Sequence, residues 1–354
     1  PPGGLSIRWP DPPLVMERRL HGPKMDAVAA FARANAIDRI VIDAPRARLG
    51  IVTTGKAYLD VRQALDDLGL DDAALARIGV RVYKIGLSWP LEARRALRFA
   101  EGLEDILVVE EKRAFVETQF VRLLYNLPSD RRPSIVGKRD ETGARLLDSE
   151  SDFTATQVAR AIVRRLARLG GQVEALLPRV ERMEAAERHT AATTLQRLPT
   201  FCSGCPHNTS TVVPEGSHAM AGIGCHGMAI FMPHRNTTTH TQMGGEGANW
   251  IGQAPFTREK HVFQNLGDGT YNHSGSIALR AAAAAGISIT YKILVNDAVA
   301  MTGGQPVEGS PTVQQIARQV DAEGAKRIAV VTDQPEKYDG QPAFPPGVTI
   351  HHRD

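Results

Sequence analysis

Two positions in the last third of the chain carry oxygen ligands of the kind that bind hard metal ions. Asp268 stands between two glycines after the apolar run 261–266, and Asn296 follows the apolar run 287–295. Both runs predict strands, and the helical stretch between them makes these strands parallel neighbours, with both side chains at one sheet edge. Hard divalent cations prefer carboxylate, amide and carbonyl oxygens. We therefore expect Asp268, Asn296 and the carbonyl of Ala298 to hold magnesium beside ligand phosphates.

The glycines on either side of Asp268 are expected to let the backbone turn sharply where the strand ends. Taken alone, Gly267-Asp268-Gly269 is also the sequence of an ordinary Asp-Gly turn, so this triplet does not decide between the two interpretations. The continuation from Asn296 includes Thr302-Gly303-Gly304-Gln305, and this second motif strengthens the interpretation as a binding site.

Three cysteines lie on loops ahead of this motif. Cys202 and Cys205 have the two-residue spacing that wraps one metal centre, and Cys225 arrives from a second Gly-rich segment. Three thiolates leave one ligand to find. A zinc site completed by His207 or His226, an iron–sulfur cluster and simple burial of the thiols all remain open from the residues alone.

Short β-branched runs alternate with amphipathic helical stretches up to about residue 150, and this alternation predicts βαβ units and a parallel sheet. We place a first α/β domain at 45–150, after a tail or linker over 1–44 that contains a helix at 25–35. The expected strands are 50–55, 80–85 and 105–110, and the expected helices are 58–68, 91–101 and 116–125.

An Ala-, Arg- and Leu-rich stretch follows the first domain. Its apolar residues recur at helical spacing, so 151–190 is interpreted as a connector of one or two surface helices with solvated arginines. From residue 198 the composition shifts to Gly, Cys, His, Met and Asn in loops, and strand and helix patterns then return at 312–323 and 327–332. A second parallel α/β domain is expected at 191–354.

Length and charge limit the classes of protein that this chain can be. A chain of 354 residues predicts two or three domains, and 42 Lys+Arg against 39 Asp+Glu argue against a nucleic-acid surface or a polybasic membrane anchor. The sequence contains neither an apolar stretch of membrane-spanning length nor a leader, and clustered cysteines suit a reducing compartment, so a cytoplasmic protein is expected. Both ends are interpreted as boundaries of a piece of a longer polypeptide.

The order of these motifs resembles that of the 2-oxoacid:ferredoxin oxidoreductases. In that family a Cys-x-x-Cys pair, a further Cys, Gly-Asp-Gly and a Thr-Gly-Gly-Gln segment follow one another as they do here. Cys205-Pro206-His207 and the stretch 267–275 are most similar to the fused, single-chain indolepyruvate ferredoxin oxidoreductases. By the same resemblance, 45–150 is similar to a transketolase C-terminal-like domain, and the last domain to a thiamine-diphosphate-binding (pyrophosphate) domain.

The resemblance implies three cofactors: thiamine diphosphate, Mg²⁺ and a 4Fe-4S cluster. The residues implied for magnesium and the diphosphate are Gly267, Asp268, Gly269, Asn296, Ala298, Thr302, Gly303 and Gln305. Cys202, Cys205 and Cys225 are implied as cluster ligands, with the fourth ligand outside this chain. Thr270 and His273, one helical turn from the metal, are candidates for contact with substrate or phosphate, and His207, His226 and Glu246 are further pocket candidates.

The implied reaction is the oxidative decarboxylation of an aryl or branched, indolepyruvate-like 2-oxoacid to acyl-CoA. The implied partners are coenzyme A, ferredoxin as the electron acceptor, the remaining domains of the enzyme and further copies in a homo-oligomer. The pyrimidine-binding domain, which in the family carries the glutamate that activates the cofactor, is not recognisable in this sequence. The chain by itself is therefore expected to be inactive.

Two alternatives stay open. A non-oxidative thiamine-diphosphate decarboxylase would need no cluster, so its iron content would separate it from the first interpretation. A zinc-stabilised, non-catalytic binding domain would hold zinc at the cysteines and would ignore thiamine diphosphate, because its Gly-Asp-Gly would only be a turn.

Overall fold

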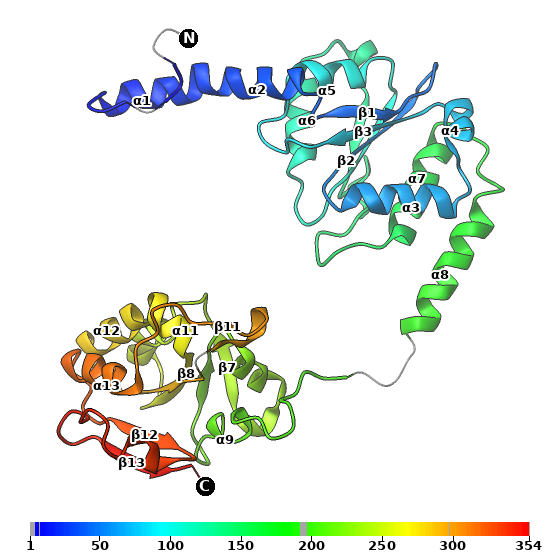
Figure 1. The fold of residues 1–354 in the computed structure, drawn as a ribbon. Helices are drawn as coiled ribbons and strands as arrows, with labels where there is room; N and C mark the ends of the chain where they lie inside the picture. Colours follow the sequence, from blue (N-terminus) through cyan, green and yellow to red (C-terminus); the bar gives the residue numbers. More distant parts are fainter. Residues whose placement is uncertain (1–3, 7, 192–196, 297, 354) are drawn as a thin grey trace. The chain divides into compact units, whose positions relative to one another are not determined.

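A computed structural model of the chain describes residues 4–6, 8–191, 197–296 and 298–353. The chain divides into two compact units, unit 1 at 1–194 and unit 2 at 195–354 (Figure 1). Each unit is an α/β structure around a mainly parallel sheet, so the predicted fold class is confirmed.

Unit 1 contains a five-stranded sheet in the order β1-β3-β2-β4-β5. The central strands are parallel, and only β1 runs antiparallel to its neighbour β3. The strands are β1 (Arg39–Ile42), β2 (Leu49–Thr54), β3 (Val80–Ile85), β4 (Asp105–Val109) and β5 (Ser134–Val136). The three predicted strands are confirmed as β2, β3 and β4, whereas β1 lies inside the predicted tail and β5 was not expected.

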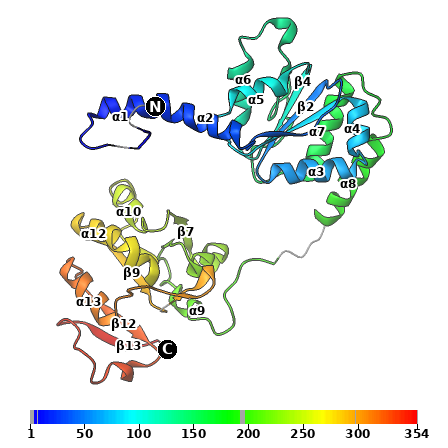
Figure 2. The same ribbon diagram turned by 45° about the horizontal axis from the view of Figure 1, so that its top comes forward.

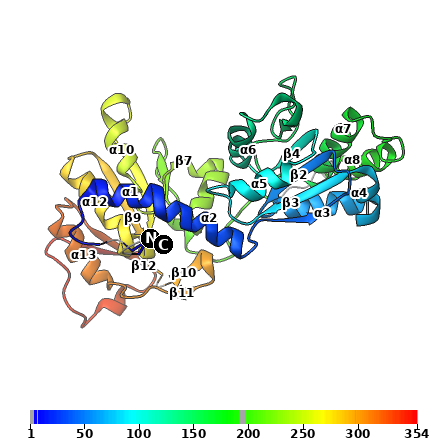
Figure 3. The same ribbon diagram turned by 90° about the horizontal axis from the view of Figure 1, so that it is seen from above.

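Helices cover both faces of this sheet, as Figures 2 and 3 show. The helices are α1 (Pro13–Arg19), α2 (Met25–Ala34), α3 (Ala57–Asp67), α4 (Asp72–Ile78), α5 (Ala93–Ala100), α6 (Val116–Leu124), α7 (Ala155–Arg168) and α8 (Leu177–Ala191). Alternation along the strands decides which residue faces which layer. In β4, Leu107 and Val109 pack with α3, α4, α7 and α8, whereas Ile106 and Val108 pack with α5 and α6.

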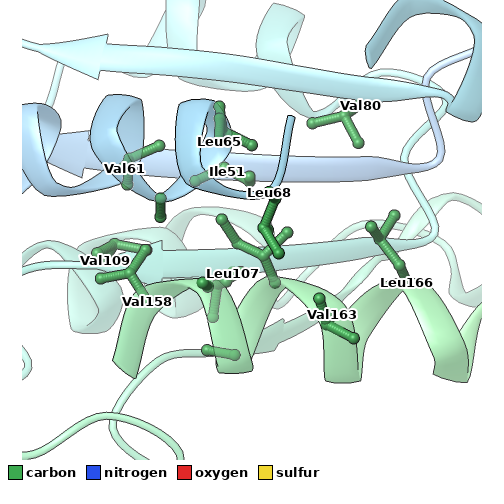
Figure 4. Close-up of a cluster of buried hydrophobic side chains, with 14 of the residues drawn as sticks. Ile51, Val61, Leu65, Leu68, Val80, Leu107, Val109, Val158, Val163 and Leu166 are labelled. Carbon is green, nitrogen blue, oxygen red and sulfur yellow. The ribbon is translucent and has the colours of Figure 1, made fainter. Parts of the chain in front are cut away.

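Helix α7 corrects the expectation of a surface connector. Val158, Val163 and Leu166 lie in the core beside Leu107 of the sheet (Figure 4). Arg165 is also buried, because Asp105 at the start of β4 accepts a hydrogen bond from its Nε at 2.7 Å. The prediction of solvated arginines is therefore wrong at this position, where an ion pair allows the charge to be buried.

Unit 2 contains a four-stranded parallel sheet in the order β7-β6-β8-β9. Its strands are β6 (Ala219–Ala221), β7 (Thr237–His240), β8 (Val262–Gly267) and β9 (Ile289–Leu294). Two strand pairs lie outside it: antiparallel β10 (Ala298–Val299) with β11 (Gln305–Pro306), and parallel β12 (Ala329–Thr332) with β13 (Thr349–His352). The predicted strands are confirmed as β8, β9 and β12, whereas β6 and β7 lie in the region expected to be loops.

The helices of unit 2 are short apart from two that pack beside β8 and β9. They are α9 (His207–Ser210), α10 (Ala248–Gln253), α11 (Asp268–Thr270), α12 (Ser276–Ala284) and α13 (Val313–Ala322). Leu266, Leu279 and Ile316 share one small core, which joins β8, α12 and α13. Over the described ranges, every helix is too short or too polar to cross a membrane.

Candidate metal and cofactor site

The predicted ligand pair meets at the carboxyl ends of β8 and β9. These strands are parallel neighbours, with Gly267 opposite Leu294. Asp268 follows directly and is buried, and its Oδ2 accepts a hydrogen bond of 2.9 Å from the backbone N–H of Asn296. The expectation that Asp268 and Asn296 lie at neighbouring strand ends is therefore confirmed. This edge of a parallel sheet is where ligands of open α/β folds bind.

The glycines beside Asp268 do not serve the purpose expected of them. Gly267 has extended dihedral angles and Asp268 starts a helix that continues through α12, so the chain passes from strand to helix without a left-handed residue. The Oδ1 atom of Asp268 accepts from Gly269 N at 2.8 Å, at the beginning of this helix. A Cβ on Gly267 would lie 3.6 Å from the His226 ring, which is ordinary van der Waals contact and places that ring beside the end of β8.

The Thr-Gly-Gly-Gln segment forms the tip of the β10–β11 hairpin beyond Asn296. Asn296 Oδ1 accepts from Ala298 N at 3.1 Å, which fixes the start of the hairpin. Thr302 Oγ1 donates to Gln305 Oε1 at 2.8 Å, and Gln305 Nε2 donates to the Thr302 carbonyl at 2.7 Å. Gly303 has a φ of 120°, in the region that favours glycine. The tip is exposed and is held together by these two hydrogen bonds between Thr302 and Gln305.

Thr270 and His273, the two residues predicted near substrate or phosphate, have different environments. Thr270 is buried in the first turn after Asp268. His273 is exposed, and its Nδ1 shares a hydrogen bond of 2.6 Å with the Ser274 hydroxyl. Their roles remain predictions.

The cysteines lie on two loops at the same end of unit 2. Cys205 N donates to the Cys202 carbonyl at 3.1 Å, and the turn between them uses a left-handed glycine, Gly204. Cys225 begins a 3-10 turn, η3 (Cys225–Phe231). All three thiols are free; Cys202 is exposed, and the other two are partly buried.

Convergence of the three sulfur atoms is not found. Across the described part of the chain, no group of three or more His, Cys, Asp or Glu side chains is placed to hold a metal ion. The chemistry of three thiolates suits an iron–sulfur or zinc centre. In the described residues, however, the cysteine side chains are not arranged as the ligands of such a centre.

Three aromatic rings connect the two cysteine loops. The His207 ring lies 5.6 Å from that of Phe201 and 5.8 Å from that of His226, measured between ring centroids. Burial lowers the pKa of His207, and it lowers the pKa of His226 to about 4, with a smaller contribution from His207. His226 is therefore a neutral imidazole near pH 7.

Buried polar atoms without partners gather beside Asp268. His226 Nε2 and both side-chain polar atoms of Asn265 accept or donate no hydrogen bond among the described residues. Asn265 is buried within β8, two residues before Gly267, and was not among the predicted site residues. The signal for it was the polar pair Gln264-Asn265 inside an apolar run. Buried polar groups ordinarily have partners, so this edge of the sheet suits a polar ligand.

Glu246 and Lys292 hold the loops around this edge. The buried carboxylate of Glu246 accepts hydrogen bonds from Gly244 N at 2.6 Å and Ile223 N at 3.4 Å. Lys292 on β9 donates to the carbonyls of Ser210 and Val212, and burial lowers its pKa. Glu246 therefore organises a loop, and Lys292 ties β9 to the segment after Cys205.

Family comparisons agree with this geometry. The family model of the thiamine pyrophosphate enzyme C-terminal TPP-binding domain matches residues 222–336, which include both strand ends of the site. Unit 2 thus contains the cofactor-binding domain of thiamine-diphosphate enzymes. The model of the indolepyruvate ferredoxin oxidoreductase middle domain matches residues 38–194 of unit 1. The chain is thus similar to the indolepyruvate ferredoxin oxidoreductases in unit 1 and to thiamine pyrophosphate enzymes in unit 2.

Relatives extend the likeness across both units. The indolepyruvate oxidoreductase subunit IorA of Methanothermobacter marburgensis is 29% identical over 308 residues, which cover 84% of this chain and 45% of the relative. The subunit IorA of Thermococcus kodakarensis is 27% identical over 312 residues, 80% of this chain and 45% of the relative. The chain thus spans somewhat less than half the length of these relatives.

Among solved structures, a 2-oxoglutarate:ferredoxin oxidoreductase from Magnetococcus marinus is 18% identical, with a TM-score of 0.28 over 43% of this chain and 23% of that one. A putative thiamin diphosphate-dependent enzyme from Mycobacterium smegmatis is 14% identical, with a TM-score of 0.30 over 93% of this chain and 63% of that one.

Proposed function

We propose that unit 2 binds the diphosphate of thiamine diphosphate through Mg²⁺, held by Asp268, Asn296 and the carbonyl of Ala298. The observation that carries this proposal is the hydrogen bond from Asn296 N to Asp268, which joins the ends of two parallel strands. Carboxylate, amide and carbonyl oxygens are the donors that magnesium takes from proteins. Thr302, Gly303 and Gln305 form the exposed hairpin tip beside the site and would cover the bound diphosphate.

The cofactor supplies the carbanion chemistry of 2-oxoacid decarboxylation when it is bound. The chain's own residues position it: Asp268 and Asn296 set the metal, and the hairpin limits access of water. Cys202, Cys205 and Cys225, with a fourth ligand from outside this chain, would hold an iron–sulfur centre, which would supply one-electron transfer to an oxidative reaction. Ferredoxin as the electron acceptor is proposed from the name of the matched middle-domain family, and coenzyme A as the acyl acceptor completes the proposed reaction.

Calorimetric titration of the chain with thiamine diphosphate, with and without Mg²⁺, tests the metal site. We expect binding only with Mg²⁺, and we expect Asp268→Ala to weaken it by more than about 100-fold, because ligand loss exceeds the usual effect of outer-shell partners. Asp321→Ala, which removes an exposed carboxylate of α13, is the matched control and should bind as the parent does. Binding that is unchanged in Asp268→Ala would show that the site lies elsewhere.

Metal analysis after anaerobic reconstitution with iron and sulfide tests the cysteine assignment. An iron–sulfur centre predicts iron and inorganic sulfide in the parent chain, with both lost in Cys225→Ser. Zinc without sulfide would instead favour a structural zinc site. Iron-free protein that still binds magnesium thiamine diphosphate would favour a non-oxidative decarboxylase.

The substrate proposed is an aryl 2-oxoacid such as indolepyruvate, by analogy with the named relatives. The test is reduction of a viologen dye with indolepyruvate, pyruvate and 2-oxoglutarate in turn, in the presence of coenzyme A. The chain should be assayed with the remaining parts of the enzyme, because it spans less than half of its relatives. Preference for pyruvate or 2-oxoglutarate would contradict the aryl assignment.

A further inference from the structure

His226 is the side chain that lies between the cysteine loops and the turn that carries Asp268. It directly follows Cys225, it is 97% buried, and its ring packs against His207 of the Cys-x-x-Cys loop. Its Cε1 atom also lies closest to the space that a side chain on Gly267 would occupy, at 3.6 Å. The imidazole of His226 therefore belongs to the Cys225 loop, contacts the Cys-x-x-Cys loop through His207, and lies beside the end of β8.

Two glycines of the same loop leave the space that this imidazole occupies. A Cβ on Gly222 would lie 2.6 Å from His226 Nε2 and 2.3 Å from the Asn265 carbonyl oxygen. A Cβ on Gly224 would lie 2.6 Å from His226 Cε1, and its three nearest atoms all belong to His226. Contacts this short do not occur for real side chains, so the loop is glycine-rich at positions where the ring needs the space. Gly224 itself is extended, with a φ of 160°, so only the ring excludes a side chain there.

We propose that His226 is a positioning residue that holds the Cys225 loop against the Gly267–Asp268 turn. Occupation of the Asp268 site by magnesium thiamine diphosphate is thereby coupled to the environment of the Cys225 thiol. The inference rests on the proposed function for its ligand, but the contacts on which it depends lie within unit 2 alone. Such coupling would keep the electron-accepting centre at a fixed place relative to the cofactor.

The test measures the rate at which a maleimide modifies Cys225 in the full chain with Cys202→Ser and Cys205→Ser, which leaves one cysteine. In this background, magnesium thiamine diphosphate should slow the modification. His226→Ala should speed modification without cofactor, abolish the protection by cofactor, and lower cofactor affinity about tenfold, as outer-shell partners of metal sites do. His226→Phe keeps a flat ring and should restore the protection, which a general loss of stability would not do.

Two further variants separate positioning from simple destabilisation. His218→Ala removes another histidine of unit 2, at the opposite end of β6, and should leave the modification rate unchanged. Gly224→Ala should act like His226→Ala, and the double variant should be no worse than His226→Ala alone, because the clash needs the ring. Losses that add in the double variant would overturn the role assigned to the ring.

The outcomes for the inference and for the proposed function can be told apart. If the parent binds no magnesium thiamine diphosphate, the proposed function fails, and the modification rates without cofactor still decide the position of Cys225. If Cys225 in the His226→Ala variant is modified at the parental rate and the cofactor still protects it fully, the positioning role of His226 is wrong.

Discussion

Two buried carboxylates end strands in the two units and are used differently. Glu110 follows β4 of unit 1, and its oxygens accept hydrogen bonds from the backbone N–H groups of Phe115, Val116 and Glu117 at 2.8–2.9 Å. It thus satisfies the amides at the start of α6. Asp268 follows β8 of unit 2, and one of its oxygens reaches across to the next strand end instead.

The difference shows how one position in a parallel α/β fold becomes either structure or site. In unit 1 the strand-end carboxylate closes its own helix, and the Lys138 ammonium donates to the Glu110 carbonyl behind it. In unit 2 the carboxylate links two strand ends, and the buried polar atoms of His226 and Asn265 beside it lack partners among the described residues. Loss of the Glu110 carboxylate should therefore lower the stability of unit 1, whereas loss of the Asp268 carboxylate should mainly weaken ligand binding.

The largest expected loss of stability comes from breaking the buried Arg165–Asp105 ion pair of unit 1. Arg165→Ala leaves the fully buried Asp105 without its main partner, at a cost of about 3–5 kcal/mol. Urea denaturation in a Trp9→Phe, Trp89→Phe background measures it, because far-UV circular dichroism follows both units while Trp250 fluorescence then reports on unit 2 alone. Arg165→Met combined with Asp105→Leu should recover most of the loss, because no buried charge then remains. A loss as large in the double variant would mean that packing, not charge, is responsible.

A smaller difference should separate the two strand-end carboxylates. Glu110→Ala removes three amide hydrogen bonds and should lower the free energy of unfolding of unit 1 by about 3 kcal/mol. Asp268→Ala should destabilise unit 2 less, because Asn296 is exposed and water can replace the lost acceptor. Thermal melts of the two variants, compared with their parent, measure both. Equal losses would remove the contrast between helix cap and binding site.

The smallest effect is a pH dependence in unit 1. Burial raises the pKa of Glu117, whose Oε2 accepts from Lys138 N at 3.1 Å. The folded state then holds this proton at pH values where the unfolded state has released it. Stability from this group is present below the unfolded pKa and decreases as pH rises through the folded pKa, by at most about 1.4 kcal/mol per pH unit. Urea melts from pH 4 to pH 7 should show a shallower decrease in Glu117→Gln.

Long apolar runs explain why much of the fold was predictable. The strands β2, β3, β4, β8 and β9 have such runs between turn residues, and each was predicted within two residues of its observed ends. The missed strands are short, and β7 is Thr-Thr-Thr-His, which has no apolar pattern. Helix α7 was predicted as a helix but misplaced to the surface, because a sequence does not show that Arg165 has a buried carboxylate as partner.

The candidate site, like the fold, could be predicted from the sequence only in part. Asp268 and Asn296 were predictable, because strand ends and parallel order fix their neighbourhood without knowledge of side-chain contacts. The position of His226 depends on ring contacts with His207 and on the space that Gly222 and Gly224 leave beside the end of β8, and these segments only meet in the folded unit. Spacing suggested three thiolates around one metal centre with a fourth ligand still to find, and the described residues do not show such a group.

The packing of α7 on the first sheet also bears on synthesis of the protein. Its residues complete a core whose other members begin at Ile42, so the earliest and latest segments of unit 1 need each other. Domains fold as units while the nascent chain leaves the ribosome. Strands β1 to β5 therefore emerge with this sheet face covered by α3 and α4 alone, and the rest of the apolar face stays open to chaperones until α7 has left the ribosome.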